Sequence, residues 1–280
     1  MGEFSTNTAL LFSVVIMFLT VYFSYRGFKD KVFFEKYLFR VDNILVSKDY
    51  KRLLTSGLLH GNWFHLIFNM YAFFSFSEAL ESQMGSGQYL MIYFFSLVGG
   101  SLFALYIHRN HGDYSAIGAS GAICGLIFAS VALFPGISIG LILIPAQIPG
   151  WLFALIFVAI SIYGIKSNAG NIGHDAHLGG ALAGMLVAIA MNPEIIFYNY
   201  IPILCLLTPT IIFLYFILAM PEILLINTSF SSRNSYMSKD EEYNLKKFNK
   251  QKDIDRILDK INEKGLDSLT SREKELLDEF

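Results

Sequence analysis

The sequence predicts an all-α membrane protein: a bundle of six membrane-spanning helices, a seventh span, and a small helical tail. Three observations carry this prediction. Of the 280 residues, 54% are hydrophobic and only 16% are charged, whereas a soluble domain has about 25% charged residues. Residues 231–280 alone hold 23 of the 44 charged residues. Several apolar runs also approach the roughly 17–25 residues that a helix needs to cross the bilayer core.

The uneven charge distribution divides the chain into three parts. We expect a membrane-embedded core at residues 1–192, a seventh transmembrane segment at residues 193–229 and a charged, helical, soluble tail at residues 230–280. The net charge of −2 gives no indication of nucleic-acid binding. Cys124 and Cys205 both lie in apolar runs, which argues against a disulfide framework.

The first expected span is Ala9–Tyr25, which contains no charged residue. We do not expect a secretory signal peptide, because no Lys or Arg precedes this run and no small-residue cleavage site follows it. The next segment, Arg26–Gly61, interleaves Phe, Tyr and Leu with eight basic and four acidic residues. This pattern suits a loop that lies in the headgroup zone of the membrane.

Five further apolar runs complete the expected six-span core. They are Trp63–Ser77, Tyr89–Ile107, Ala116–Leu133, Trp151–Ile165 and Ala176–Met191. The stretch before Trp151 contains two prolines and two glycines, and we expect it to form a loop at the interface, where backbone groups can find protein or water partners. The last apolar run, Tyr200–Ile226, predicts the seventh span.

The tail is expected to form two short helices. Ile254, Ile257 and Ile261 fall on one face at the period of an amphipathic helix. Gly265 would end this helix, and Ser268 opens a set of N-cap candidates for the second. A small solvated helical hairpin is the favoured interpretation, and binding to a partner is the alternative.

Polar side chains interrupt the apolar runs at four places. Such groups are costly at membrane depth and usually functional. The four sets are His60, His65 and Asn69; Glu78 and Glu81; Ser120; and His174 and His177. His65 and Asn69 are four residues apart and therefore share one helix face. We expect His60 at or before the start of that helix and His174 in a loop.

Ser120 and His177 would supply a nucleophile and a base. A hydroxyl is a weak nucleophile and needs an adjacent base, which His177 can be at about 2.6–3.2 Å if the two helices touch. Small residues four apart let membrane helices approach closely. The candidates are Gly121 and Gly125 on one helix and Gly180 and Gly184 on the other.

The start of the helix near Ser120 also offers oxyanion stabilisation. Free backbone N–H groups and the positive end of the helix dipole lie there, and the Asn69 amide and the His65 imidazole can add side-chain donors. We expect no metal and no other cofactor. The chain has no H-E-x-x-H sequence, and Asp175 is the only carboxylate adjacent to one of these histidines.

Taken in order, these motifs resemble the rhomboid family of intramembrane serine proteases. They are His60-x4-His65-x3-Asn69, Gly118-Ala-Ser120-Gly, and Ala176-His177-x2-Gly180-x3-Gly184, and the likeness covers about residues 9–192. The resemblance implies a rhomboid-like six-helix core, with Ser120 as nucleophile and His177 as general base in a dyad without an acidic member. It assigns His65, Asn69, Gly118 and the Ser120 N–H to the oxyanion and substrate-binding site.

The resemblance also extends to supporting positions. Arg52 and Glu81 match family positions that look structural, and His60, Gly180 and Gly184 belong to the same supporting set. Cys124 stands where the family often has an aromatic residue, four positions after the serine. The seventh span and the charged tail resemble extensions of some bacterial members.

By the same resemblance, the substrate would be a single-pass membrane protein whose helix unwinds near small or helix-destabilising residues. It would approach laterally between Trp63–Ser77 and Trp151–Ile165, in a bacterial inner membrane. The family's usual bacterial topology puts the N-terminus in the cytoplasm, yet the Lys/Arg bias of short loops would put the basic loop there instead. Either this loop is an embedded structure exempt from the rule, which we favour, or the protein is inverted.

Two other functions are weighed against the protease. A catalytically silent protein of the same architecture would bind transmembrane segments and tolerate loss of Ser120 or His177. A channel or transporter would use the intramembrane histidines as a relay, but the sequence shows no obvious internal repeat.

Overall fold

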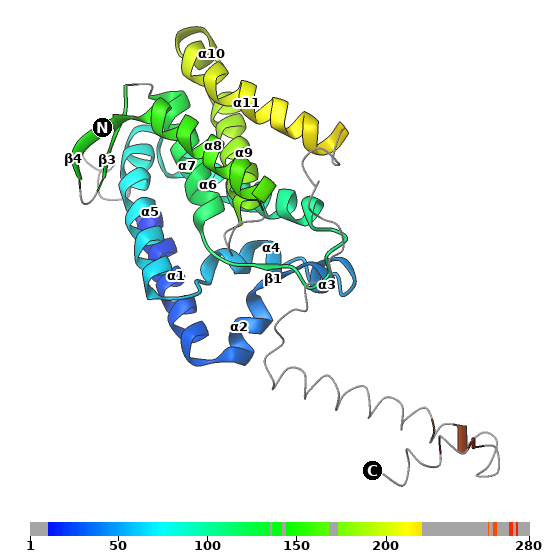
Figure 1. Ribbon diagram of the computed structural model, residues 1–280. Coiled ribbons are helices and arrows are strands. Elements are labelled where there is room, and N and C mark those ends of the chain that lie inside the picture. Colours follow the sequence, from blue (N-terminus) through cyan, green and yellow to red (C-terminus); the bar gives the residue numbers. More distant parts are fainter. Residues whose placement is uncertain are drawn as a thin grey trace. The chain divides into compact units, whose positions relative to one another are not determined.

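The computed structural model describes residues 11–134, 136–141, 144–167 and 173–219, together with residues 257, 260, 261, 269, 270 and 273. By internal contacts, the chain divides into two units, Met1–Leu225 and Ile226–Phe280. The first unit is built from helices, as the all-α prediction requires (Figure 1). Its described strands form only two short antiparallel pairs.

The first helix and the basic segment after it are more regular than expected. Helix α1 (Leu11–Lys29) runs past the predicted end at Tyr25. The segment that follows, which we name the first loop (residues 30–62), contains five short elements. They are α2 (Lys31–Tyr37), β1 (Phe39–Arg40), α3 (Val41–Leu45), α4 (Arg52–Thr55) and the 3-10 turn η1 (Ser56–Leu58).

Helix α5 (Trp63–Met84) continues beyond the predicted end at Ser77. The extension carries Glu81, whose side chain is fully buried. Its carboxylate accepts hydrogen bonds from Ser13 of α1 and from Ser86. These donors offset the cost of burying a charge, so the acidic residues near the end of α5 do not stop the helix.

Helix α6 (Ser86–Ile107) is followed by a loop and by α7 (Ser120–Leu133). The expected start of this span at Ala116 is wrong, because Ala116 belongs to β2 (Ser115–Ala116) and pairs with Phe39 of β1. Gly118 has a φ of +119°, which is incompatible with a helix and favours glycine. The helix therefore begins at Ser120.

The Pro/Gly stretch before α8 is not an irregular loop. It forms an antiparallel pair, β3 (Ser138–Leu141) with β4 (Ile144–Pro149), in which Ser138 opposes Pro149. The pairing gives its backbone groups partners, as a position near the membrane requires. Helix α8 (Gly150–Ser167) follows directly, and α9 (His174–Met191) comes next. His174, expected in a loop, is the first residue of α9.

Helices α10 (Ile195–Tyr198) and α11 (Tyr200–Ala219) end the described part of this unit. Among the described residues, α1, α6 and α9 are long and apolar enough to cross a membrane, while α7, α8 and α11 contain shorter apolar stretches. Helix α11 occupies residues 200–219 of the run predicted as the seventh span, and the rest of that run lies outside the described residues. That it crosses the bilayer stays a prediction.

Helix α7 is the central element of the body. It contacts α5, α6, α8, α9 and α11, and α6 and α9 pack most extensively against it (Figure 1). Every residue from Gly121 to Ala132 is buried. The neighbouring helices therefore surround α7 along its length and fix the position of its first residue, Ser120.

In the second unit, the structure describes six residues, and the predicted helical hairpin stays a prediction. The Thr270 N–H donates to Glu273, and the Glu273 N–H donates back to the Thr270 hydroxyl, at 2.8 and 3.3 Å. This reciprocal pair has the hydrogen-bond pattern of a capping box. Lys260 forms an ion pair with Glu273 at 2.7 Å and, with the Thr270 groups, lowers the pKa of that carboxyl to about 2. Gly265 and Ser268 lie outside the described residues.

Candidate active site

The two residues singled out by the motifs lie in contact. Ser120 is the first residue of α7 and His177 is the fourth residue of α9. Ser120 Oγ lies 2.6 Å from His177 Nε2. With the proton of the imidazole on Nδ1, the hydroxyl donates to Nε2, which is the arrangement that a general base needs.

Glycines make this contact possible. A Cβ atom on Gly180 would lie 2.1 Å from the carbonyl oxygen of Gly121, and one on Gly184 would lie 2.5 Å from Gly125 Cα. Helices α7 and α9 therefore touch backbone to backbone, as the spacing of these four glycines predicts. Gly100 of α6 lies against α9 in the same way, because its Cβ would be 2.5 Å from the carbonyl oxygen of Ala176.

His65 and Gly118 lie beside the Ser120 hydroxyl. The point where a Gly118 Cβ would stand is 3.1 Å from Nε2 of His65 and 3.6 Å from Ser120 Oγ. A side chain at Gly118 would fill the space between the imidazole and the hydroxyl. The Gly118 N–H donates to the Ser56 carbonyl at 3.0 Å, which ties this segment to the first loop.

Asn69 is buried one helical turn after His65. Its amide nitrogen donates to the His65 carbonyl at 2.9 Å. This bond uses one of the two amide protons and leaves the second one for another acceptor. The His65 N–H in turn donates to Asn62, the N-cap of α5, at 2.8 Å.

A small cavity borders Ser120. Its volume is about 40 Å³, and its mostly apolar lining includes the hydroxyl-bearing residues Ser56, Ser101 and Ser120. A site that is polar and larger than about 10–15 Å³ can hold a water molecule. The nucleophile candidate thus has room for water beside it within an otherwise apolar body.

Comparison with known proteins decides the family. The family model of the Rhomboid domain matches residues 47–194, a little over half of the chain. The chain belongs to the rhomboid family. A second model, of a family of unknown function (DUF6576), matches residues 237–280 in the tail.

Named rhomboid relatives come from bacteria and mitochondria. The chain is 32% identical to the mitochondrial Rhomboid protein 1 of Saccharomyces cerevisiae, over 55% of this chain and 45% of the yeast protein. It is 32% identical to the putative rhomboid protease YdcA of Bacillus subtilis, over 51% and 68% of the two chains. It is also 32% identical to the rhomboid protease AarA of Providencia stuartii, over 52% and 57%. The match thus spans about half to two thirds of these relatives' lengths.

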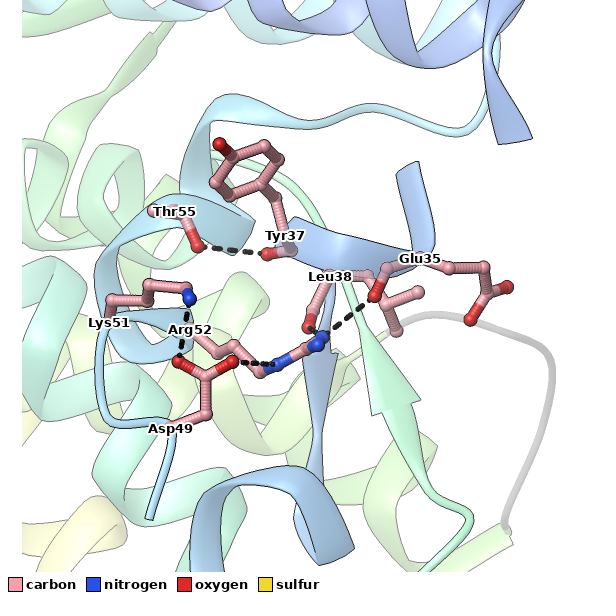
Figure 2. Close-up of polar contacts among 7 residues, drawn as sticks. All are labelled: Glu35, Tyr37, Leu38, Asp49, Lys51, Arg52 and Thr55. Carbon is pink, nitrogen blue, oxygen red and sulfur yellow. Dashed lines mark hydrogen bonds and ion pairs between the residues drawn. The ribbon is translucent and has the colours of Figure 1, made fainter. Parts of the chain in front are cut away.

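In this rhomboid chain, Arg52 organises the first loop. Its buried guanidinium donates to the carbonyls of Glu35 and Leu38 at 2.8 and 2.7 Å and to the Asp49 carboxylate at 2.9 Å (Figure 2). Burial opposes ionisation of Asp49, but hydrogen bonds from Lys51 and Arg52 outweigh it and lower its pKa. The loop is therefore a fixed structure, held around one cation.

His60, at the end of the first loop, packs between α1 and the start of α5. Nδ1 of its fully buried ring forms a hydrogen bond with the Ser24 hydroxyl, 3.0 Å away. The ring stands edge-to-face to the His65 ring, with centroids 4.8 Å apart. Burial, and secondarily the nearby His65, lower the pKa of His60 to about 3. His60 is therefore a neutral packing group that lies behind His65.

One neighbour of His177, Phe157, was not singled out from the sequence. Phe157 of α8 lies with its ring 5.9 Å from the His177 ring, at an angle of 36°. Cys124, one turn after Ser120, is buried in α7. The ring centroids of His174 and His177 lie 6.0 Å apart. The His174 ring packs against Gly164 of α8, where an added Cβ would lie 2.2 Å from the His174 ring. One face of α8 therefore covers both histidines.

The carboxylate nearest in sequence to His177 bonds elsewhere. Asp175 accepts from Tyr114 and lies 3.2 Å from His108. Asp175 therefore bonds to Tyr114 and lies beside His108, and it does not act as the third member of a triad with Ser120 and His177. Neither Tyr114 nor His108 was singled out from the sequence, because each stands in a polar loop where such residues are common.

Proposed function

We propose that this protein is an intramembrane serine endopeptidase that cleaves transmembrane segments, with Ser120 as nucleophile and His177 as general base. The observation that carries the proposal is the 2.6 Å contact between Ser120 Oγ and His177 Nε2. A serine is activated when a base lies within hydrogen-bond reach of its hydroxyl. Membership of a family whose named relatives include rhomboid proteases supports the same role.

The reaction would proceed through an acyl-enzyme. His177 Nε2 removes the hydroxyl proton as Ser120 Oγ attacks the scissile carbonyl carbon. The imidazolium then gives this proton to the leaving amine, and the C–N bond breaks. Water, activated in turn by His177, attacks the ester and releases the carboxyl product and the free serine. The cavity beside Ser120 is a nearby source for that water.

Three donors would stabilise the oxyanion: the Ser120 backbone N–H and the side chains of His65 and Asn69. Ser120 begins α7, whose first N–H groups have no intrahelical acceptor and where no side chain caps the helix. The second amide proton of Asn69 is available to a substrate oxygen. Gly118 leaves the space between these groups open.

Single-pass membrane proteins are the proposed substrates. The carbonyls of a lipid-buried helix are already hydrogen-bonded, so a scissile bond reaches Ser120 only where the helix unwinds. Small or helix-destabilising residues favour such unwinding. The 14 residues of α7 extend about 21 Å, less than the bilayer core of about 30 Å. Ser120 would therefore lie below one membrane surface, with lateral access between α5 and α8.

The protein is an integral membrane protein, and we propose the bacterial inner membrane as its location. The seventh helix and the charged tail support this through their likeness to extensions of some bacterial members. The end of α1 and the start of the first loop have pairs of basic and aromatic residues, which are typical of a membrane interface. Arg26 lies 4.5 Å from the Phe33 ring and Lys29 lies 4.4 Å from the Tyr25 ring.

Labelling with a fluorophosphonate probe tests the proposal. The purified protein in detergent is compared with Ser120→Ala and His177→Ala, with gel filtration to check that each variant is folded. We expect labelling of the wild type and its loss in both variants. A folded wild type that takes up no probe would count against the peptidase and favour a silent protein that binds transmembrane segments.

A further inference from the structure

A second polar cluster lies beside the Ser120–His177 pair. His108 follows the last residue of α6, Tyr114 precedes β2, and Asp175 is the second residue of α9. The Tyr114 hydroxyl donates to the Asp175 carboxylate, 3.3 Å from Oδ1 and 3.4 Å from Oδ2. His108 Nε2 lies 3.2 Å from Oδ2 of the same residue. We name these three residues the clamp cluster.

Burial distinguishes the clamp cluster from a surface ion pair. The Asp175 side chain is 6% exposed and that of His108 is 21% exposed. The His108 ring is stacked on the Tyr114 ring, with centroids 3.5 Å apart and 9° between the planes. Burial raises the pKa of the Tyr114 hydroxyl, and the Asp175 charge raises it further. The hydroxyl therefore keeps its proton and remains a donor.

The clamp cluster joins the two segments that carry the candidate dyad. Tyr114 lies six residues before Ser120, in the segment that continues through β2 to the start of α7. Asp175 lies two residues before His177, in the first turn of α9. Their hydrogen bond connects the chain just before the nucleophile to the helical turn just before the base.

The first loop holds Tyr114 from its other side. The Tyr114 carbonyl accepts from the Val41 N–H at 3.2 Å, and the Tyr114 ring stands edge-to-face to Phe39 at 6.2 Å. The following residues pair with β1. Asp175 is therefore bonded to a fixed partner, so the bond constrains the first turn of α9 and not merely a loop.

We propose that the clamp cluster sets the position of His177 relative to Ser120, with Tyr114 and Asp175 as positioning residues. This role rests on the proposed peptidase function. Glycine contacts pack α6 and α7 against α9 at Ala176, Gly180 and Gly184, and the clamp cluster adds a side-chain bond from Asp175 to the segment before α7. A misplacement of about 1 Å can slow a reaction about 10²-fold. Because the glycines retain part of the geometry, we expect about a tenfold loss.

The test compares labelling kinetics by a fluorophosphonate probe in the full-length protein in detergent. Tyr114→Phe removes the hydroxyl and keeps the stacked ring. Asp175→Leu removes the acceptor, and Asp175→Asn keeps one acceptor oxygen. We expect the rate constant to fall about tenfold in the first two and to recover most of this loss in Asp175→Asn. Tyr50→Phe, at a tyrosine that is 58% exposed in the first loop, should match the wild type.

Rate constant and final labelled fraction separate positioning from folding. A positioning role lowers the rate constant at an unchanged final fraction. A purely structural role lowers the final fraction at an unchanged rate constant, and either that result or unchanged rates in Tyr114→Phe would overturn the proposal. A folded wild type that takes up no probe would overturn the proposed function and this role with it. Should Asp175→Leu not fold, Tyr114→Phe still decides the question.

Discussion

The substitution Gly180→Ala tests whether the contact between the helix backbones holds the Ser120–His177 pair together. The added Cβ would lie 2.1 Å from the Gly121 carbonyl oxygen, whereas real Cβ atoms essentially never come within 3.0 Å of another atom. Backbone cannot rotate away as a side chain can. Helices α7 and α9 must therefore separate by at least about 0.9 Å, which would stretch the 2.6 Å contact to about 3.5 Å, the limit of a hydrogen bond.

A displacement of this size predicts a loss of about 10²-fold in the labelling rate of Ser120 by a fluorophosphonate probe. Gly87→Ala in α6 is the matched control, because its Cβ would meet nothing within 4 Å, and its rate should equal that of the wild type. Gly121→Ala, whose Cβ would lie 3.1 Å from the Ala176 carbonyl oxygen, should lose activity to an intermediate degree. A folded Gly180→Ala protein that labels within threefold of the wild type would refute the reasoning.

Two further predictions concern stability. His60 has a pKa of about 3 in the folded protein, below its ordinary value of 6.5, so the unfolded chain binds more protons between these two pH values. Its contribution to stability is complete above about pH 6.5 and is lost as the pH falls towards 3. Thermal unfolding measured across this pH range should show that the free energy of unfolding rises with pH in the wild type. The rise should be the same in His111→Gln, which changes an exposed histidine, and smaller in His60→Gln. Gly164→Ala should lower the free energy of unfolding by about 1–3 kcal/mol, because the Cβ overlaps the His174 ring. Adding His174→Ala should restore most of that loss, and a double variant as unstable as Gly164→Ala would contradict this contact.

The sequence was most informative where a polar group interrupts an apolar run. Ser120 and His177 stand out because groups of their kind are costly in a membrane helix, and the glycines at intervals of four predict that their helices touch. The family resemblance added roles for His65 and Asn69, which stay predictions. Helix positions were also predictable from apolar length, to within a few residues for most spans.

Contacts between distant segments that no motif marks were beyond such reasoning. Phe157 is one apolar residue among many in α8, and only the packing of α8 on α9 brings it to His177. Tyr114 and Asp175 are 61 positions apart and join only through the fold. The start of α7 was misplaced because Ala116 is apolar enough for a helix, while its strand pairing with Phe39 depends on a segment far away in the sequence.

The shortness of α7 has a consequence for topology assignment. A crossing of 14 residues falls below the length at which spans are ordinarily counted. In the six-span core proposed here, overlooking it would change the parity of the count. Every segment from β3 onward would then be assigned to the wrong compartment, the charged tail included. The helix that carries the proposed nucleophile thus also decides on which side of the membrane the C-terminal half of the chain is placed.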